Sequence, residues 1–184
     1  MENKLLHPRR GGRARAPGAL AVLWLAGCAS VGPAGPGMAP AGPDDPFLAN
    51  LVGRWDLTRS IRGKEEANRV DADWAIGHRY VRLHMVDVAA PPKYEAIVMI
   101  GYDPSGARYV AHWTDSWGAQ YSGVGYGKRV GDTVDFVFAA PDGSRFHNAF
   151  TWEPGERTWR SRMENEGADG RRSFFAEDRL RRIP

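Results

Sequence analysis

Residues 47–184 show no long helical periodicity, and short turn signals recur from residue 103 onward. Each signal combines a residue that fixes φ, or that bonds its own backbone, with a glycine that tolerates positive φ. They stand at 103–106, 141–143, 154–155 and 167–170. The runs between them are short and rich in aromatic and β-branched residues, which favours strands. This part of the chain is therefore predicted to be all-β.

Ten strands are expected in sequence order, which is typical of an antiparallel meander. Their approximate ranges are 51–61, 69–75, 78–88, 93–102, 107–116, 119–128, 132–140, 144–153, 156–165 and 172–182. An open sheet of this width exposes two unpaired edges, so closure into a barrel is the simplest solution, with a two-sheet β-sandwich as the alternative. Only residues 47–51 are compatible with a short helical turn, which we expect to plug one barrel end.

A basic N-terminal stretch runs into an apolar segment at 19–27, which is followed by Cys28, the single cysteine of the chain. About nine apolar residues are too few to span a bilayer but are typical of the hydrophobic region of an export signal. The sequence Leu25-Ala-Gly-Cys28 resembles the lipobox of bacterial lipoproteins. That resemblance implies a signal peptide at 1–27 and a Cys28 thiol that forms a thioether to diacylglycerol.

The residues after Cys28 are interpreted as a tether, because 29–46 contain five prolines and four glycines and cannot form a core. The expected organisation is a signal peptide at 1–27, the lipidated cysteine and linker at 28–46, and one barrel domain at 47–184. Ala29 stands where many inner-membrane lipoproteins have an aspartate. The resemblance therefore implies a cell-envelope location, lipid-anchored in the outer membrane and facing the periplasm.

The charge balance argues against nucleic acid as a partner. Five of the 25 Lys and Arg residues, and one of the 22 Asp and Glu residues, lie in the expected signal peptide, so the remainder carries about one net negative charge. A nucleic-acid-binding domain normally carries a clear basic excess. The expected partners are the membrane, through the lipid on Cys28, and a small molecule.

Two local patterns resemble known barrel families. The triplet Gly53-Arg-Trp55 resembles the Gly-x-Trp opening of lipocalins and related calycin barrels. The sequence GYDP at 101–104, followed by Tyr109 and by HWTDS at 112–116, is similar to a family of uncharacterised bacterial lipocalin-like proteins. The similarity covers most of 47–182 and implies a calycin/lipocalin-like barrel with a ligand cavity, but no known reaction.

The calycin resemblance also implies structural roles for single residues. In calycins the tryptophan packs across the closed barrel end, and an arginine of the last strand lies over its ring in a cation–π contact. These roles fall to Gly53, Trp55 and Arg179, with Arg181 as the alternative arginine. Haem ligation of the nitrobindin type is not expected, because no histidine follows His147, and no other cofactor is indicated.

Acidic residues stand inside two otherwise apolar strands. The period of two places Glu95 and Met99 on one face of the first strand, and Trp113 and Asp115 on one face of the next. If both faces line the lumen, the carboxylates lie in an aromatic cavity, where desolvation raises their pKa values and they meet polar groups of a ligand. The alternative is that Trp113 fills the core and the acids point to solvent or pair with an arginine.

No catalytic or metal site is expected. His78 and His84 share a predicted strand face but lie roughly 20 Å apart along it, too far to share one ion. The chain has no phosphate-binding loop, hydrolase elbow or metalloprotease motif. The sequence therefore favours a tethered envelope lipoprotein whose barrel binds a small, partly apolar ligand. The alternatives are an envelope scaffold or interaction module with a filled barrel and, third, an enzyme.

Overall fold

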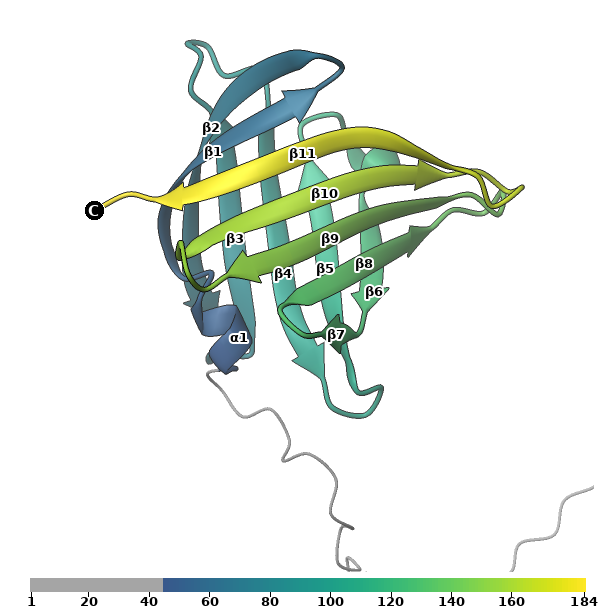
Figure 1. The fold of residues 1–184 in the computed structure, drawn as a ribbon, viewed down its shortest axis with the longest axis horizontal. Coiled ribbons are helices and arrows are strands. Elements are labelled where there is room, and N and C mark those ends of the chain that lie inside the picture. The colour runs from purple at the N-terminus through teal and green to yellow at the C-terminus, as the bar shows by residue number, and fades with distance from the viewer. Residues whose placement is uncertain (1–44) are drawn as a thin grey trace, which may run out of the picture. The chain divides into compact units, whose positions relative to one another are not determined.

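The structure is a computed structural model and describes residues 45–184 (Figure 1). Helix α1 spans Pro46–Ala49, and the 3₁₀ turn η1 spans Ala119–Tyr121. The strands are β1 (Gly53–Ile61), β2 (Lys64–Ala75), β3 (Tyr80–Asp87), β4 (Glu95–Asp103), β5 (Arg108–Asp115), β6 (Gly123–Gly127), β7 (Arg129–Val130), β8 (Thr133–Ala139), β9 (Arg145–Glu153), β10 (Thr158–Glu166) and β11 (Arg172–Arg182). Cys28 and the expected signal peptide lie outside the described residues, and so does the expected tether up to residue 44.

The strands form one antiparallel sheet that closes on itself. Its order is β6-β5-β4-β3-β2-β1-β11-β10-β9-β8-β7, so the first strand pairs with the last. The two ends of this order meet where β6 pairs with β8 at Gly125↔Phe138 and Tyr126↔Val137. Ten strands thus form a barrel, and the two-residue β7 continues β6 along β8 in the same register. The predicted barrel is confirmed, and the sandwich alternative is wrong.

Glycines make the closure between β6 and β8 possible. A Cβ atom at Gly125 would lie 2.6 Å from the ring of Phe138, which projects from β8 into the barrel. At Gly127 a Cβ would run into the backbone carbonyl of Asp135. Strand glycines allow this close approach because they have no side chain. The glycines of β6 therefore allow this strand to approach β8 closely enough to close the barrel.

Two strand boundaries differ from the sequence prediction by more than two residues. β2 begins at Lys64 rather than at about 69, because a two-residue turn with positive φ at Arg62 and Gly63 carries the hairpin further. Residues 64–67 are exposed and the first buried residue, Asn68, is polar, so no apolar alternation indicates a strand there. β6 begins only at Gly123, because the preceding residues form η1.

One end of the barrel is closed by α1. Asp45 caps the helix by accepting hydrogen bonds from the backbone amides of Phe47 (2.9 Å) and Leu48 (3.0 Å). Both of these side chains are buried in the barrel mouth, and burial of each contributes roughly 1.5 to 3 kcal/mol. The predicted plug at 47–51 is confirmed. It starts one residue earlier because Pro46 is well suited to the first helical position.

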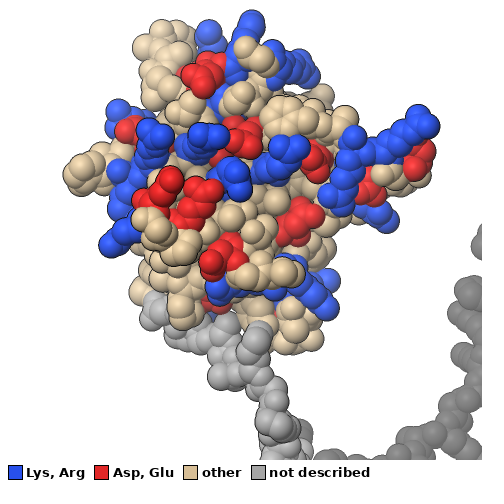
Figure 2. Space-filling view, in the orientation of Figure 1, with Lys and Arg blue, Asp and Glu red and all other residues tan. Residues whose placement is uncertain are grey.

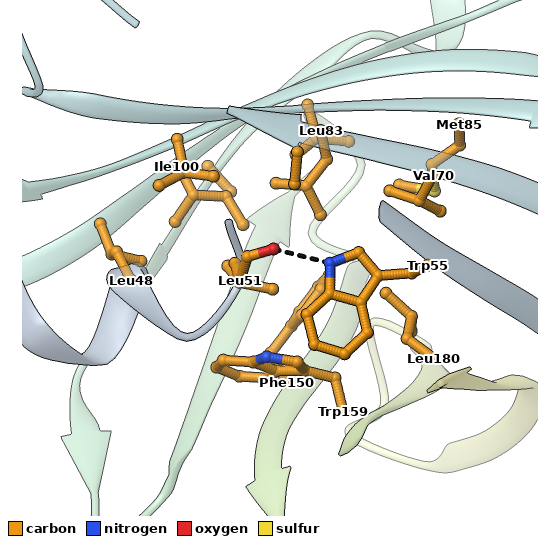
Figure 3. Packing of buried hydrophobic residues seen from close by; sticks show 14 of the residues in the cluster. Leu48, Leu51, Trp55, Val70, Leu83, Met85, Ile100, Phe150, Trp159 and Leu180 are labelled. Atoms are coloured by element: carbon orange, nitrogen blue, oxygen red, sulfur yellow. Dashed lines mark hydrogen bonds between the residues drawn. The ribbon is translucent and has the colours of Figure 1, made fainter. Parts of the chain in front are cut away.

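Trp55 lies across this closed end and is fully buried, and its indole N–H donates to the carbonyl of Leu51 at 2.7 Å (Figure 3). An arginine of the last strand does lie over its ring, but it is Arg182, with its guanidinium carbon 4.4 Å from the ring centroid. The assignment to Arg179 or Arg181 is wrong. Arg182 lies opposite Trp55 in the β1–β11 register, whereas Arg179 lies three positions away on the outer face.

Gly53 leaves space for the arginine that lies over Trp55. Its φ is +138°, and a Cβ atom there would run into the guanidinium of Arg182. The same guanidinium donates to the carbonyls of Val52 (2.8 Å) and Asn50 (3.1 Å). A glycine at this position therefore lets Arg182 reach the Trp55 ring and tie α1 to the last strand.

Candidate ligand-binding site

Opposite α1, the barrel ends in five hairpin connections, which we call the distal end. They cover residues 62–63, 88–94, 116–122, 140–144 and 167–171. The inward-facing side chains toward this end include polar ones beside apolar ones such as Met163 and Ala176. Arg59, Asn68 and Asp178 are buried there on β1, β2 and β11, whereas the residues around α1 and Trp55 form an apolar core.

Arg59 and Asp178 form a buried ion pair between the first and last strands. Both contacts, Nε to Oδ1 and Nη2 to Oδ2, are 2.7 Å, and the residues are 7% and 3% exposed. Burial raises the pKa of Asp178, and the hydrogen bonds from Arg59 act against that rise. A buried ion pair gains little net stability, because desolvation of the two charges offsets their attraction. Its presence in the lumen is therefore not explained by folding alone.

Asn68 lies on the neighbouring strand and is 4% exposed. Its side-chain oxygen, Oδ1, is buried and has no hydrogen-bond partner among the described residues. Buried polar atoms in proteins are nearly always hydrogen-bonded, so an unpaired acceptor marks a place where a further donor would be stabilised.

Asp115 faces inward at the end of β5. Its Oδ2 accepts hydrogen bonds from the indole N–H of Trp113 (3.2 Å) and from the hydroxyl of Tyr94 (3.5 Å), and its Oδ1 accepts from the amide of Trp117 (3.0 Å). All three donors are neutral, and within residues 45–184 no Lys or Arg forms an ion pair with this carboxylate. Burial raises the pKa of Tyr94, and the Asp115 charge adds to the rise while the Arg59 charge opposes it.

Aromatic side chains lie next to Asp115, beginning with Tyr94 and Trp113, which donate to it. Tyr94 and Trp117 meet edge to face, with centroids 5.6 Å apart, and Trp117 meets Tyr121 in the same way at 6.2 Å. Trp117 and Tyr121 are 52% and 62% exposed, so they stand at the solvent-facing rim, while Trp113 packs against the core. The guanidinium of Arg59 lies 5.2 Å from the centroid of the Tyr94 ring. Within residues 45–184, the distal end thus combines a carboxylate that has hydrogen bonds but no ion-pair partner, a buried ion pair and accessible rings.

Of the four residues predicted to bind ligand, the structure brings only Trp113 and Asp115 together inside the barrel. Glu95 and Met99 lie on the outer face, because Ala96, Val98 and Ile100 are the inward-facing residues of β4. On that outer face, Glu95 Oε1 lies 2.7 Å from His84 Nε2. The prediction that both acids share one cavity is therefore wrong.

Two hollows are present elsewhere on the described residues. One, of about 30 Å³, lies beside α1 between Asp45 and His78. The other, of about 420 Å³, lies on the outside of β3 to β6. Its floor is Gly101, against which the Tyr80 ring packs, and the guanidinium of Arg108 lies 4.1 Å from the centroid of the Tyr126 ring at its side.

The outer face of β8 to β11 carries interleaved acidic and basic side chains (Figure 2). Buried His147 contacts Asp135 through Nδ1 and Glu166 through Nε2, both at 2.9 Å. Arg145 (2.7 Å) and Arg172 (3.1 Å) also donate to Glu166. These hydrogen bonds, of which that from Arg145 has the largest effect, hold the pKa of the Glu166 carboxyl below its ordinary value. These contacts join four strands and describe a structural network.

Within residues 45–184, no group of three or more His, Cys, Asp or Glu side chains is arranged to hold a metal ion. No helix of this part of the chain is long and apolar enough to cross a membrane. His78 lies in the β2–β3 turn with positive φ and stacks on Trp74, so it does not share a strand face with His84 as predicted.

The sequence reading missed Arg59, Asn68 and Asp178. Arg59 follows Trp55 and Leu57 at every second residue of β1, and Asp178 precedes Leu180 in the same way on β11. Each of these strands therefore has a charged residue at an inward-facing position of the period-two pattern, which could have indicated the buried pair. Those two strands must be neighbours in a closed barrel, so the opposite charges were positioned to pair.

The fold and this arrangement define a closed antiparallel β-barrel with one apolar, plugged end and with buried polar side chains toward the other end. The family model described as a protein of unknown function, DUF1579, matches residues 41–133, just over half of the chain. The chain belongs to this family.

One solved structure with similarity to this chain is a protein with unknown function from the DUF3598 family of Nostoc punctiforme. It is 7% identical, the match covers 74% of this chain and 98% of that chain, and the TM-score is 0.22. No curated protein matches the chain.

Proposed function

We propose that this barrel binds a small, partly apolar ligand in the lumen at its distal end. The observation that carries the proposal is the incomplete pairing of inward-facing polar groups at this end alone. Asn68 Oδ1 has no donor among the described residues, and Asp115 has only neutral partners there. A ligand with a polar group and an apolar body would complete these contacts and pack on the aromatic rings.

The proposal keeps Trp113 and Asp115 as ligand-binding residues and adds Asn68. Retained-ligand analysis by native mass spectrometry of the full chain, purified from its own cells, tests it. We expect an additional small mass that is lost on denaturation and is reduced by Asp115→Asn. Glu95→Gln is the matched control, since that carboxylate lies on the outer face of the adjacent strand. Absence of any bound mass, or equal loss in both variants, would contradict the proposal.

A second candidate is an interaction module without a ligand, and the outer surface favours it. Ile97, Val124 and Tyr126 are exposed on the outside of β4 and β6, beside the 420 Å³ hollow. A filled barrel with an exposed apolar patch is typical of a protein-binding surface. Loss of partner binding in Tyr126→Ser, with no retained small molecule in the wild type, would favour this function over the first.

We further propose that the chain is an envelope lipoprotein anchored through Cys28, with the outer membrane as its site. Support comes from the lipobox-like sequence before the only cysteine and from the Pro- and Gly-rich segment that follows it. Cys28→Ser should abolish metabolic labelling with palmitate and leave an uncleaved precursor, because the peptidase acts after lipid addition. Continued labelling of the Ser variant would disprove this anchor.

A further inference from the structure

The charge and ring geometry around Asp115 indicate the chemical class of the ligand. We infer that the distal end binds a quaternary or methylated ammonium group, held between the aromatic rings and the Asp115 carboxylate. This inference rests on the proposed ligand-binding function and specifies its substrate class.

The carboxylate favours a cation. Asp115 is held in place by three neutral donors, and no basic side chain within residues 45–184 pairs with it. Its negative charge therefore stays available to a ligand and repels anions. An opposite charge within about 4 to 6 Å stabilises the charged form of a carboxylate, which makes a cationic ligand the natural complement.

The rings favour the same kind of ligand. Trp117 stands nearly perpendicular to Tyr121 and at 63° to Tyr94, so the three rings form a corner with faces in different directions. Aromatic faces carry negative electrostatic potential and attract cations, with tryptophan the strongest. Of these three rings, only that of Tyr94 has a guanidinium near it among the described residues, which leaves the exposed Trp117 and Tyr121 rings open to a ligand cation.

The hydrogen-bond inventory distinguishes a methylated cation from a primary amine. A primary ammonium has three N–H donors that each need an acceptor. Asp115 Oδ2 already accepts two hydrogen bonds and Oδ1 accepts one. A methylated ammonium needs no acceptors and packs its methyl groups on the rings. A metal ion is a poor fit, because a hard cation requires about six oxygen ligands and this corner offers one carboxylate.

Titration of tryptophan fluorescence tests the inference on the full chain in maltoside detergent. The probes are choline and 3,3-dimethylbutan-1-ol, which replaces the ammonium nitrogen by carbon and so has nearly the same shape without the charge. We expect choline to bind at least about tenfold more tightly than the alcohol, since only choline gains the cation–π and carboxylate attraction. Dihexanoylphosphatidylcholine below its micelle concentration separates two sources of this group: tighter binding than choline indicates a lipid headgroup, weaker binding a free solute.

Three variants locate the binding. Asp115→Asn and Trp117→Ala should each weaken choline binding by roughly tenfold. Asp115→Asn should leave the binding of the alcohol nearly unchanged, and Trp117→Ala should weaken it less than it weakens choline, since the alcohol loses only packing on the ring. Trp117→Ala changes a half-exposed ring, so the fold should persist. The control Glu95→Gln removes a carboxylate from the outer face of the neighbouring strand and should leave choline binding unchanged.

The outcomes separate this inference from the proposed function. Equal binding of choline and its neutral counterpart would overturn the ammonium assignment but leave a ligand site in place. The same conclusion would follow if neither probe binds while native mass spectrometry finds a retained neutral or anionic molecule. If neither probe binds and no molecule is retained, both the assignment and the proposed function fail.

Discussion

The buried Arg59–Asp178 pair allows a sharp test of what the polar lumen contributes to folding. Removing one partner leaves the other charge buried without compensation. We therefore expect Arg59→Met or Asp178→Leu alone to lower the free energy of unfolding by about 3 to 5 kcal/mol. The double variant, with two apolar side chains in the same space, should be within about 1 kcal/mol of wild type or more stable.

The geometry sets this magnitude. Two hydrogen bonds of 2.7 Å join nearly fully buried groups. At an effective dielectric constant of 20, the Coulomb attraction between charges about 4 Å apart is roughly 4 kcal/mol, and desolvation of both ions costs a similar amount. The attraction and its cost are lost together only in the double variant, so the coupling in a double-mutant cycle should be large.

Urea denaturation of wild type, both single variants and the double variant measures the cycle. Recovery of stability in the double variant supports the view that this pair is held in the lumen for a reason other than stability. If the double variant is destabilised about as much as either single variant, the pair stabilises the fold in its own right and the reasoning is wrong.

Two further substitutions probe the closed end and the outer network. Gly53→Ala should cost about 2 kcal/mol, through its positive φ and displacement of Arg182, and should lower Tm by roughly 5 °C; Gly155→Ala, with open space around it, is the control and should leave Tm unchanged. The pKa of Glu166 is lowered in the folded state, so its stabilisation is fully present above its ordinary value of 4.5 and is lost as pH falls through the folded pKa. Denaturation across pH 2 to 7 should show the gap between wild type and Glu166→Gln closing on acidification, and a constant gap would contradict this.

The barrel could be predicted because its information is local. Turn residues divide the chain into short runs, and ten such runs cannot remain an open sheet without exposing two edges. The helical plug was visible for the same reason, as the one stretch compatible with a helical turn. Residues 64–68 were missed, because four exposed residues followed by a buried asparagine show no apolar alternation that would indicate a strand.

The site could be predicted only in part, because it depends on register between strands. Residues 94–100 are apolar on both faces apart from Glu95, so a period of two cannot tell which face is inside. The register decides it: Val98 lies opposite Trp113 and Ala96 opposite Asp115, and opposite residues share a face. With Trp113 inside, Glu95 must be outside. The wrong prediction that Arg179, rather than Arg182, lies over Trp55 has the same cause, since the β1–β11 register could not be read from the sequence.

A crystal structure of the full chain, purified from its own cells without added ligands, tests the central claim most directly. The account predicts density for a small molecule in the distal lumen, with a donor near Asn68 Oδ1 and a methylated cationic group near Asp115 and the Trp117 ring. Density for a small molecule in the outer hollow beside Tyr126, or a distal lumen filled by side chains alone, would contradict it.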